Sequence, residues 1–151
     1  MTGYEPMIVN RNWDRATEAD WAEVLAGLPL FSKLRQIKLR RIVRQAQFSE
    51  FAPGETVVVQ GAPGDWFYVI LGGEAKVVGK PGVLRTGDYF GEIALLDGGS
   101  RTATVVATSD LHVMRMPRAL FLAVVEQNPD VALTLLTGLG ARVRRLELAN
   151  A

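Results

Sequence analysis

The spacing of apolar and polar residues changes twice along the chain. Between residues 17 and 46, apolar side chains recur at helical spacing. From 48 to 116 the chain consists of short runs rich in β-branched and aromatic residues, such as WFYVIL at 66–71, separated by turns rich in glycine and proline. Helical spacing returns between 117 and 148. The pattern therefore predicts N-terminal helices, a β-rich middle and two C-terminal helices.

The β-rich middle favours an antiparallel arrangement. Short strands at this spacing, joined by turns such as GAPGD at 61–65 and KPG at 80–82, are typical of a sandwich or jelly roll. We expect a mainly β fold with flanking helices. Residues 1–16 show no clear period and are interpreted as an N-terminal tail. Residues 17–151 are expected to form one domain, because no repeat or low-complexity linker divides them.

Several residues indicate where the helices begin. Thr17 followed by Asp20 resembles a capping box, and Ser32 can cap the second helix. Pro117 suits a first helical turn. The triplet Asn128–Pro129–Asp130 combines a capping side chain, a proline and an acid in the first turn, which predicts the start of the last helix.

Composition excludes several classes of function. The 151 residues include no cysteine, which excludes disulfides, thiolate catalysis and cysteine-ligated zinc. Seventeen basic and 16 acidic residues give a net charge of +1, so no nucleic-acid partner is expected. We interpret the basic run at 33–44 as the solvated face of an amphipathic helix rather than a nucleic-acid contact. No signal peptide and no apolar run of the roughly 18 residues that a span needs is present, so we expect a cytoplasmic protein without a membrane partner.

The sequence shows no catalytic arrangement. His112 is the only histidine, and it is interpreted as a packed or surface residue rather than a metal ligand. The aromatic residues Trp66, Phe67, Tyr68 and Phe90 are interpreted as β core rather than a stacking platform. We therefore predict neither an enzyme nor a metal site nor a cofactor, although a jelly-roll enzyme remains an alternative.

The stretch FGEIALLDGGSRTAT at 90–104 carries the candidate chemistry. Gly91 permits close approach of the backbone, and residues 92–96 can form a short helix whose first N–H groups attract an anion. Arg101 is a permanent cation that can hold a phosphate through two parallel hydrogen bonds. Glu92 is a good acceptor for a sugar hydroxyl. This combination predicts a pocket for a ribose phosphate, and the alternative is a salt bridge between Glu92 and Arg101 across a loop.

The same stretch resembles the phosphate-binding cassette of the cyclic-nucleotide-binding domains. The family pattern is close to F-G-E-[LI]-A-L, a loop and then R-[TSA]-A-x-[VI], and Phe90–Val105 matches it position by position. The flanking motifs also match the family: PGE at 53–55, QGAPGDWFYVILGGEAKV at 60–77 and GD at 87–88. The resemblance covers about residues 30–148.

The resemblance implies a fold, a ligand and a set of binding residues. The fold would be an eight-stranded antiparallel β-roll with N-terminal helices and two C-terminal helices. Glu92 would bind the ribose 2′-hydroxyl and Arg101 the cyclic phosphate. The backbone of Gly91, Ile93 and Ala94 would complete the cradle, with Thr102 at its edge. The last helix would act as a lid, and its candidates to touch the base are Arg142, Arg144, Arg145 and Leu146.

The function that the resemblance implies is a sensor that binds cAMP and transmits occupancy by moving its C-terminal helix to an effector protein in trans. A cGMP-selective version and a ligand-free interaction module are alternatives, since threonine at 102 accompanies either purine. The stripe Ala132, Leu136, Leu139, Val143 and Leu146 leaves open a homodimer through this helix as well as packing on the β-roll.

The sequence departs from the family pattern in three places. Ser100 stands where many members have proline, which is expected to loosen the loop before the arginine. The connection GKPG at 79–82 is shorter than usual. No output domain follows the last helix in this sequence, so a transcription factor is not expected and the chain is either a stand-alone module or part of a longer protein.

Overall fold

The computed structural model describes residues 16–150; the N-terminal tail predicted for 1–16 lies almost wholly outside them. The N-terminal helices are α1 (Glu18–Ala26), the 3-10 turn η2 (Pro29–Phe31) and α2 (Gln36–Gln45). The strands are β1 (Gln47–Phe51), β2 (Thr56–Val58), β3 (Trp66–Gly72), β4 (Ala75–Val77), β5 (Tyr89–Phe90), β6 (Val105–Ala107) and β7 (Leu111–Pro117). The remaining helices are α3 (Glu92–Asp97), α4 (Arg118–Gln127) and α5 (Pro129–Ala149).

The strands form two antiparallel sheets. One has the order β1-β7-β3-β5 and the other the order β2-β6-β4. Strand β3 lies inside the larger sheet and pairs with β7 and β5, so that Tyr68 lies opposite both Arg115 and Phe90. This arrangement of sheets with flanking helices is the predicted β-roll, but the described residues contain seven strands where eight were expected. The difference is small, because just after the GKPG connection Leu84 forms an isolated bridge with Ala75 instead of a regular strand.

The continuous apolar run of β3 has a direct structural cause. Successive side chains of a strand point to opposite faces, and both faces of β3 are covered. Phe67 and Val69 belong to the core between the larger sheet and the helices. Tyr68 and Ile70 belong to a second core inside the β-roll. The interpretation of Phe67 and Tyr68 as core residues is thus confirmed. A strand that is buried on both faces has no polar alternation, as in WFYVILG.

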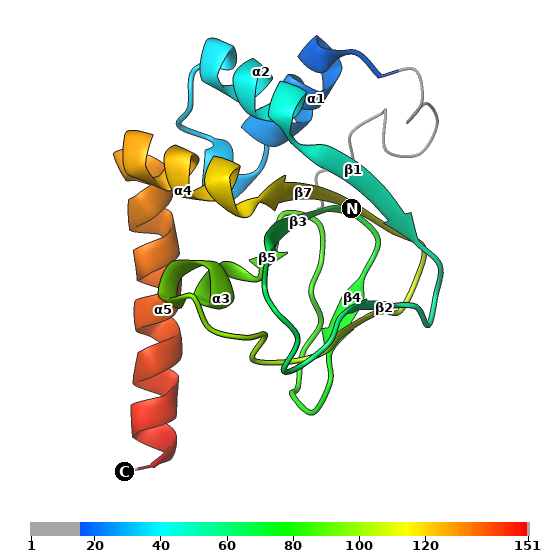
Figure 1. The fold of residues 1–151 in the computed structure, drawn as a ribbon, viewed down its shortest axis with the longest axis vertical. Helices are drawn as coiled ribbons and strands as arrows, with labels where there is room; N and C mark the ends of the chain where they lie inside the picture. Colours follow the sequence, from blue (N-terminus) through cyan, green and yellow to red (C-terminus); the bar gives the residue numbers. More distant parts are fainter. Residues whose placement is uncertain (1–15, 151) are drawn as a thin grey trace.

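The helices cover one face of the larger sheet (Figure 1). In this view helices α1 and α2 lie above strands β1 and β7, α4 lies beside the end of β7, and β2 and β4 lie on the other side. Helix α5 leaves α4 at a bend of 105° and runs past α3. Among residues 16–150 no single helix has the length and apolar character of a membrane span, and only the bent pair of α4 and α5 passes that test, by length and composition alone.

The predicted capping box at Thr17 is confirmed, since the Thr17 side chain accepts from Asp20 N at 3.1 Å and Asp20 accepts from Thr17 N at 2.9 Å. The prediction that Ser32 caps the second helix is wrong. Its hydroxyl donates to Pro29 O within the 3-10 turn, and α2 begins after Arg35 without a side-chain cap.

Asn128 is the residue before α5, as predicted, but its side chain does not cap that helix. Asn128 is buried, its amide donates to Val124 O at 2.8 Å, and its carbonyl accepts from Lys38 Nζ at 3.0 Å. The side chain therefore ties α4 and α2 together at the bend from which α5 departs. Pro117 ends β7 and takes the N-cap position of α4 rather than a position inside its first turn.

Candidate functional site

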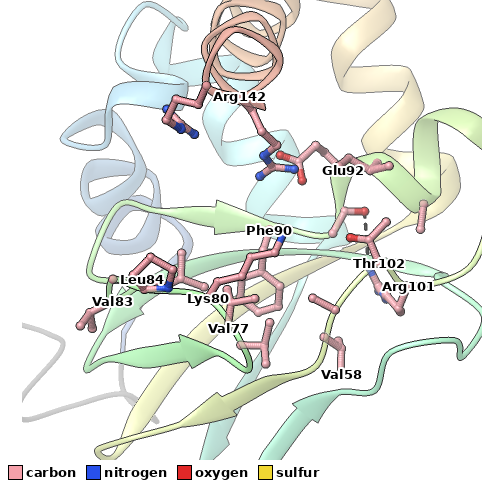
Figure 2. Close-up of a pocket in the computed structure, with 18 of the residues that line it drawn as sticks. Val58, Val77, Lys80, Val83, Leu84, Phe90, Glu92, Arg101, Thr102 and Arg142 are labelled. Carbon is pink, nitrogen blue, oxygen red and sulfur yellow. Dashed lines mark hydrogen bonds between the residues drawn. The ribbon is translucent and has the colours of Figure 1, made fainter. Parts of the chain in front are cut away.

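A cavity of about 480 Å³ opens between the β-roll, helix α3 and the C-terminal half of α5. Nine of the ten residues predicted for the binding site and lid line this cavity (Figure 2): Gly91, Glu92, Ile93, Ala94, Arg101, Thr102, Arg142, Arg145 and Leu146. Arg144, the further lid candidate, is exposed and is not among the lining residues. The fold thus brings the cassette and the last helix, about forty residues apart in sequence, to one pocket.

Gly91 is the residue on which the local geometry depends. It has φ of 95°, a left-handed conformation that favours glycine, and it begins α3. A Cβ at this position would lie 2.5 Å from Arg101 Nη1 and 3.0 Å from Trp66 O. No other residue fits both the backbone angle and the space, so the glycine is what allows the arginine to pass beneath the start of α3.

Arg101 is held under that turn by the backbone. Its Nη2 donates to Trp66 O at 2.6 Å and its Nη1 donates to Gly91 O at 3.3 Å, while its side chain is only 6% exposed. The loop before it is tied to the 61–62 segment, because Arg101 N donates to Ala62 O at 2.8 Å and Gly61 N donates to Arg101 O at 2.9 Å. Burial lowers the pKa of Arg101 from its ordinary value. The guanidinium nevertheless remains the fixed positive charge of the pocket.

Glu92, the first residue of α3, is the acidic group of the pocket. It is 5% exposed, and burial raises its pKa above the ordinary 4.5, partly offset by hydrogen bonds from the Glu92 and Ile93 N–H groups and by the positive charge of Arg142. Among the described residues no ion pair within 4.0 Å joins Glu92 to Arg101. The alternative of a salt bridge across the loop is therefore not what the structure contains. The two buried charges both face the cavity.

Helix α5 approaches the cavity from the side (Figure 2). Arg142 faces Glu92, and its charge acts on both Glu92 and Tyr89. Leu146 lines the cavity but stays 58% exposed, so the end of the helix covers the opening only loosely. Closer to α4, Gly138 lies against the hydroxyl of Tyr89, where an added Cβ would come within 2.8 Å of Tyr89 Oη.

One wall of the cavity was not predicted from the sequence. The segment Lys80–Leu84, which follows β4, lines it together with apolar residues of the β-roll: Val58, Val77, Phe90 and Val105. The ring of Phe90 stacks on Tyr68 with centroids 4.9 Å apart and an angle of 2°. The shortness of the GKPG turn was the available signal, because a short connection keeps Lys80 close to the strands that border the pocket.

The residues set aside as structural have ordinary surroundings. His112 Nδ1 lies 3.0 Å from Glu50 Oε1 on the neighbouring strand, and burial lowers the pKa of His112. Trp66 is half-buried, with the Arg115 guanidinium 4.1 Å above its ring. Residues 16–150 contain no group of three or more His, Asp or Glu side chains that could hold a metal ion.

An antiparallel β-roll whose pocket buries one arginine and one glutamate beside a helix is the arrangement expected of a small-molecule-binding domain. The sequence model of the cyclic nucleotide-binding domain matches residues 48–128. The chain therefore belongs to the cyclic nucleotide-binding domain family. This is a regulatory family rather than a catalytic one, in agreement with the prediction that the chain is not an enzyme.

Relatives and solved structures agree with this assignment. A cAMP-dependent protein kinase regulatory subunit of Aspergillus fumigatus is 37% identical over 71% of this chain and 27% of its own length. A CRP-like cAMP-activated global transcriptional regulator of Mycobacterium tuberculosis is 28% identical over 82% of this chain and 58% of its own. The crystal structure of Thermus thermophilus catabolite activator protein has a TM-score of 0.70 and 29% identity, covering 80% of this chain and 61% of that chain. The chain thus spans less than two thirds of each of these proteins.

Proposed function

We propose that the protein is a cytoplasmic sensor that binds cAMP in this pocket. Arg101 binds the cyclic phosphate and Glu92 accepts a hydrogen bond from the ribose 2′-hydroxyl, while the backbone of Gly91, Ile93 and Ala94 surrounds the phosphate and Thr102 borders it. The observation that carries the proposal is that Arg101 and Glu92 are 6% and 5% exposed, face the same cavity and form no ion pair with each other. A buried cation and a buried anion that face one cavity suit a ligand that carries an anionic group next to a hydroxyl.

The hydrogen-bonding capacity of Arg101 supports this assignment. A guanidinium has five N–H groups, and the protein uses two of them, for Trp66 O and Gly91 O. The protein contacts fix the plane of the group, and the remaining donors are available for the two free oxygens of a cyclic phosphate.

The proposed output is a movement of α5. The Leu146 side chain lines the pocket while it is largely exposed, so a purine in the pocket gives it an apolar surface to cover. Arg142 and Arg145 would follow it toward the base. A ligand that shifts a helix from about 1% to about 99% closed must bind the closed form more tightly by about 5.5 kcal/mol. The effector that detects the movement is a protein in trans, and the exposed stripe of α5 around Leu136 and Val143 is the surface we propose for it or for a second copy of the chain.

The test is calorimetric titration of the purified protein with cAMP, cGMP and 5′-AMP. We expect cAMP to bind and 5′-AMP to bind much more weakly, because the phosphate of 5′-AMP carries more charge and is no longer fixed by a ring to the sugar that Glu92 would contact. A cGMP affinity far above that of cAMP would support the cGMP-selective alternative. Absence of binding and of thermal stabilisation by either cyclic nucleotide would refute the proposal and favour a ligand-free interaction module.

A further inference from the structure

The pocket contains more positive charge than one cyclic nucleotide accounts for. Its lining residues carry four cations and one anion: Lys80, Arg101, Arg142 and Arg145 against Glu92. Arg142 acts on Glu92, and a cyclic phosphate brings one negative charge for Arg101. Arg142 and Arg145 belong to the proposed lid, so Lys80, in the turn after β4, is the cation of the lining that is left without an assigned role.

The turn at 79–82 fixes the position of Lys80. Gly79 and Gly82 have φ of 81° and 94°, Pro81 restricts the backbone between them, and Lys80 N donates to Val77 O at 3.2 Å. The side chain extends beside Phe90, on the side of the pocket away from Arg101 and Thr102 (Figure 2). A ligand whose phosphate contacts Arg101 and whose base lies at the opposite side of the pocket would place that base near Lys80.

The side chains at this base end can donate hydrogen bonds but offer almost no acceptor. Lys and Arg are donors only, and the lining residues include no Asn, Gln, Asp or Ser. Apart from Glu92, which the ribose uses, Thr102 supplies the one side-chain acceptor of the lining. Guanine presents two acceptors, O6 and N7, on one edge, whereas adenine presents N7 next to the donor N6. A donor-only wall therefore matches a 6-oxopurine better than a 6-aminopurine.

We propose that Lys80 is a base-recognition residue that donates to the O6/N7 edge of a 6-oxopurine, so that this module accepts cGMP as well as cAMP. The inference rests on the proposed binding of a cyclic nucleotide in this pocket. Lys80 strengthens the binding of cGMP, whose base offers the two acceptors O6 and N7, whereas the base of cAMP offers only N7 on this edge.

The experiment compares the wild type, Lys80→Met and Lys76→Met by titration with cAMP, cGMP and cIMP. Methionine keeps the apolar part of the side chain and removes the charge and the donors. Lys76 is the matched control, since it is exposed on β4 between Ala75 and Val77 and does not line the pocket. We expect Lys80→Met to weaken cGMP and cIMP by about tenfold and cAMP by less than about threefold. Lys76→Met should leave all three affinities unchanged.

The outcomes separate this inference from the proposed function. If the wild type binds no cyclic nucleotide, the proposed function fails and the inference falls with it. If Lys80→Met weakens all three ligands equally, Lys80 acts only through its charge on the phosphate; the inference is then overturned and the proposed function stands. The same holds if Lys80→Met has no effect, or if cIMP follows cAMP, because the 2-amino group of guanine would then carry the difference. Thermal unfolding of each variant verifies that the fold is retained.

Discussion

Replacing Arg101 with alanine tests the site most directly, because this side chain has one role in stabilising the free protein and a separate proposed role in binding the ligand. In the protein it donates to Trp66 O and Gly91 O. In the complex it would donate to the cyclic phosphate. The variant should therefore lose both stability and affinity, and the two losses can be measured separately.

The magnitudes follow from the burial of the group. A charged partner removed from a desolvated ion pair costs about 2–5 kcal/mol of binding free energy, which corresponds to a loss of affinity of roughly 30-fold to several thousand-fold. The two backbone carbonyls left without a donor cost about 1 kcal/mol each in stability. Removing the guanidinium also relieves its own desolvation, so the net loss of stability of the free protein should be smaller than the loss of binding.

The assay is calorimetric titration with cAMP, combined with thermal unfolding without ligand. Arg101→Lys keeps the charge but not the two-pronged geometry, so its affinity should lie between those of the wild type and the alanine variant. Arg44→Ala is the control: it removes one positive charge from an exposed salt bridge with Glu18, on a side chain that is 59% exposed. Binding by a folded Arg101→Ala variant within about threefold of the wild type would refute the assignment of the phosphate to Arg101.

Three further predictions concern the glycines and the acid of the site. Gly91→Ala should destabilise the fold by more than Gly54→Ala. Both glycines have positive φ, so alanine costs about 1–2 kcal/mol at either position, but of the two only Gly54 has free space for an added Cβ. Equal melting temperatures of the two variants would contradict this. Gly140→Ala should stabilise α5 by up to about 1 kcal/mol, because an added Cβ meets nothing there. Gly138→Ala should not give this gain, because its Cβ would lie 2.8 Å from the Tyr89 hydroxyl. Equal stabilisation by both variants would show that α5 shifts freely. Burial raises the pKa of Glu92 above 4.5, so the folded state binds this proton more tightly than the unfolded chain. The melting temperature of the wild type should therefore fall relative to that of Glu92→Gln as the pH rises from about 4.5 through the raised pKa. A difference in melting temperature between the two proteins that does not vary with pH would contradict this reasoning.

The fold was largely predictable because the spacing of apolar residues that distinguishes a helix from a strand can be seen within each short segment. The β3 run is apolar without alternation, and burial on both faces requires that pattern. The capping predictions show where such reasoning fails. Asn128 and Ser32 have suitable side chains at suitable places, but a tertiary contact with Lys38 uses the Asn128 side chain, and a local hydrogen bond to Pro29 O uses the Ser32 hydroxyl. A cap is favoured by about 1 kcal/mol, and a competing hydrogen bond is worth as much.

The cassette residues were predictable because residues 90–104 are continuous in sequence, so the glycine, acid and arginine could be seen together. Lys80 and Tyr89 could not be assigned in this way. Lys80 belongs to a turn that appeared only to be short, and its place in the pocket depends on the pairing of β4 with β6. The contact of Tyr89 depends on Gly138, almost fifty residues away in the sequence.

The position of Gly138 suggests how the pocket and α5 are connected. Strand β5 carries Tyr89 immediately before the cassette, and its hydroxyl lies against α5 at Gly138, one helical turn before Arg142. Arg142 in turn acts on both Tyr89 and Glu92. Under the proposed function, a ligand hydroxyl bonded to Glu92 would compete with Arg142 for the same carboxylate, so occupancy of the sugar site would weaken the attraction between Glu92 and α5. The contact at Gly138 would then be the fixed end of the moving segment, and the exposed turns beyond Arg142 would be the part that moves.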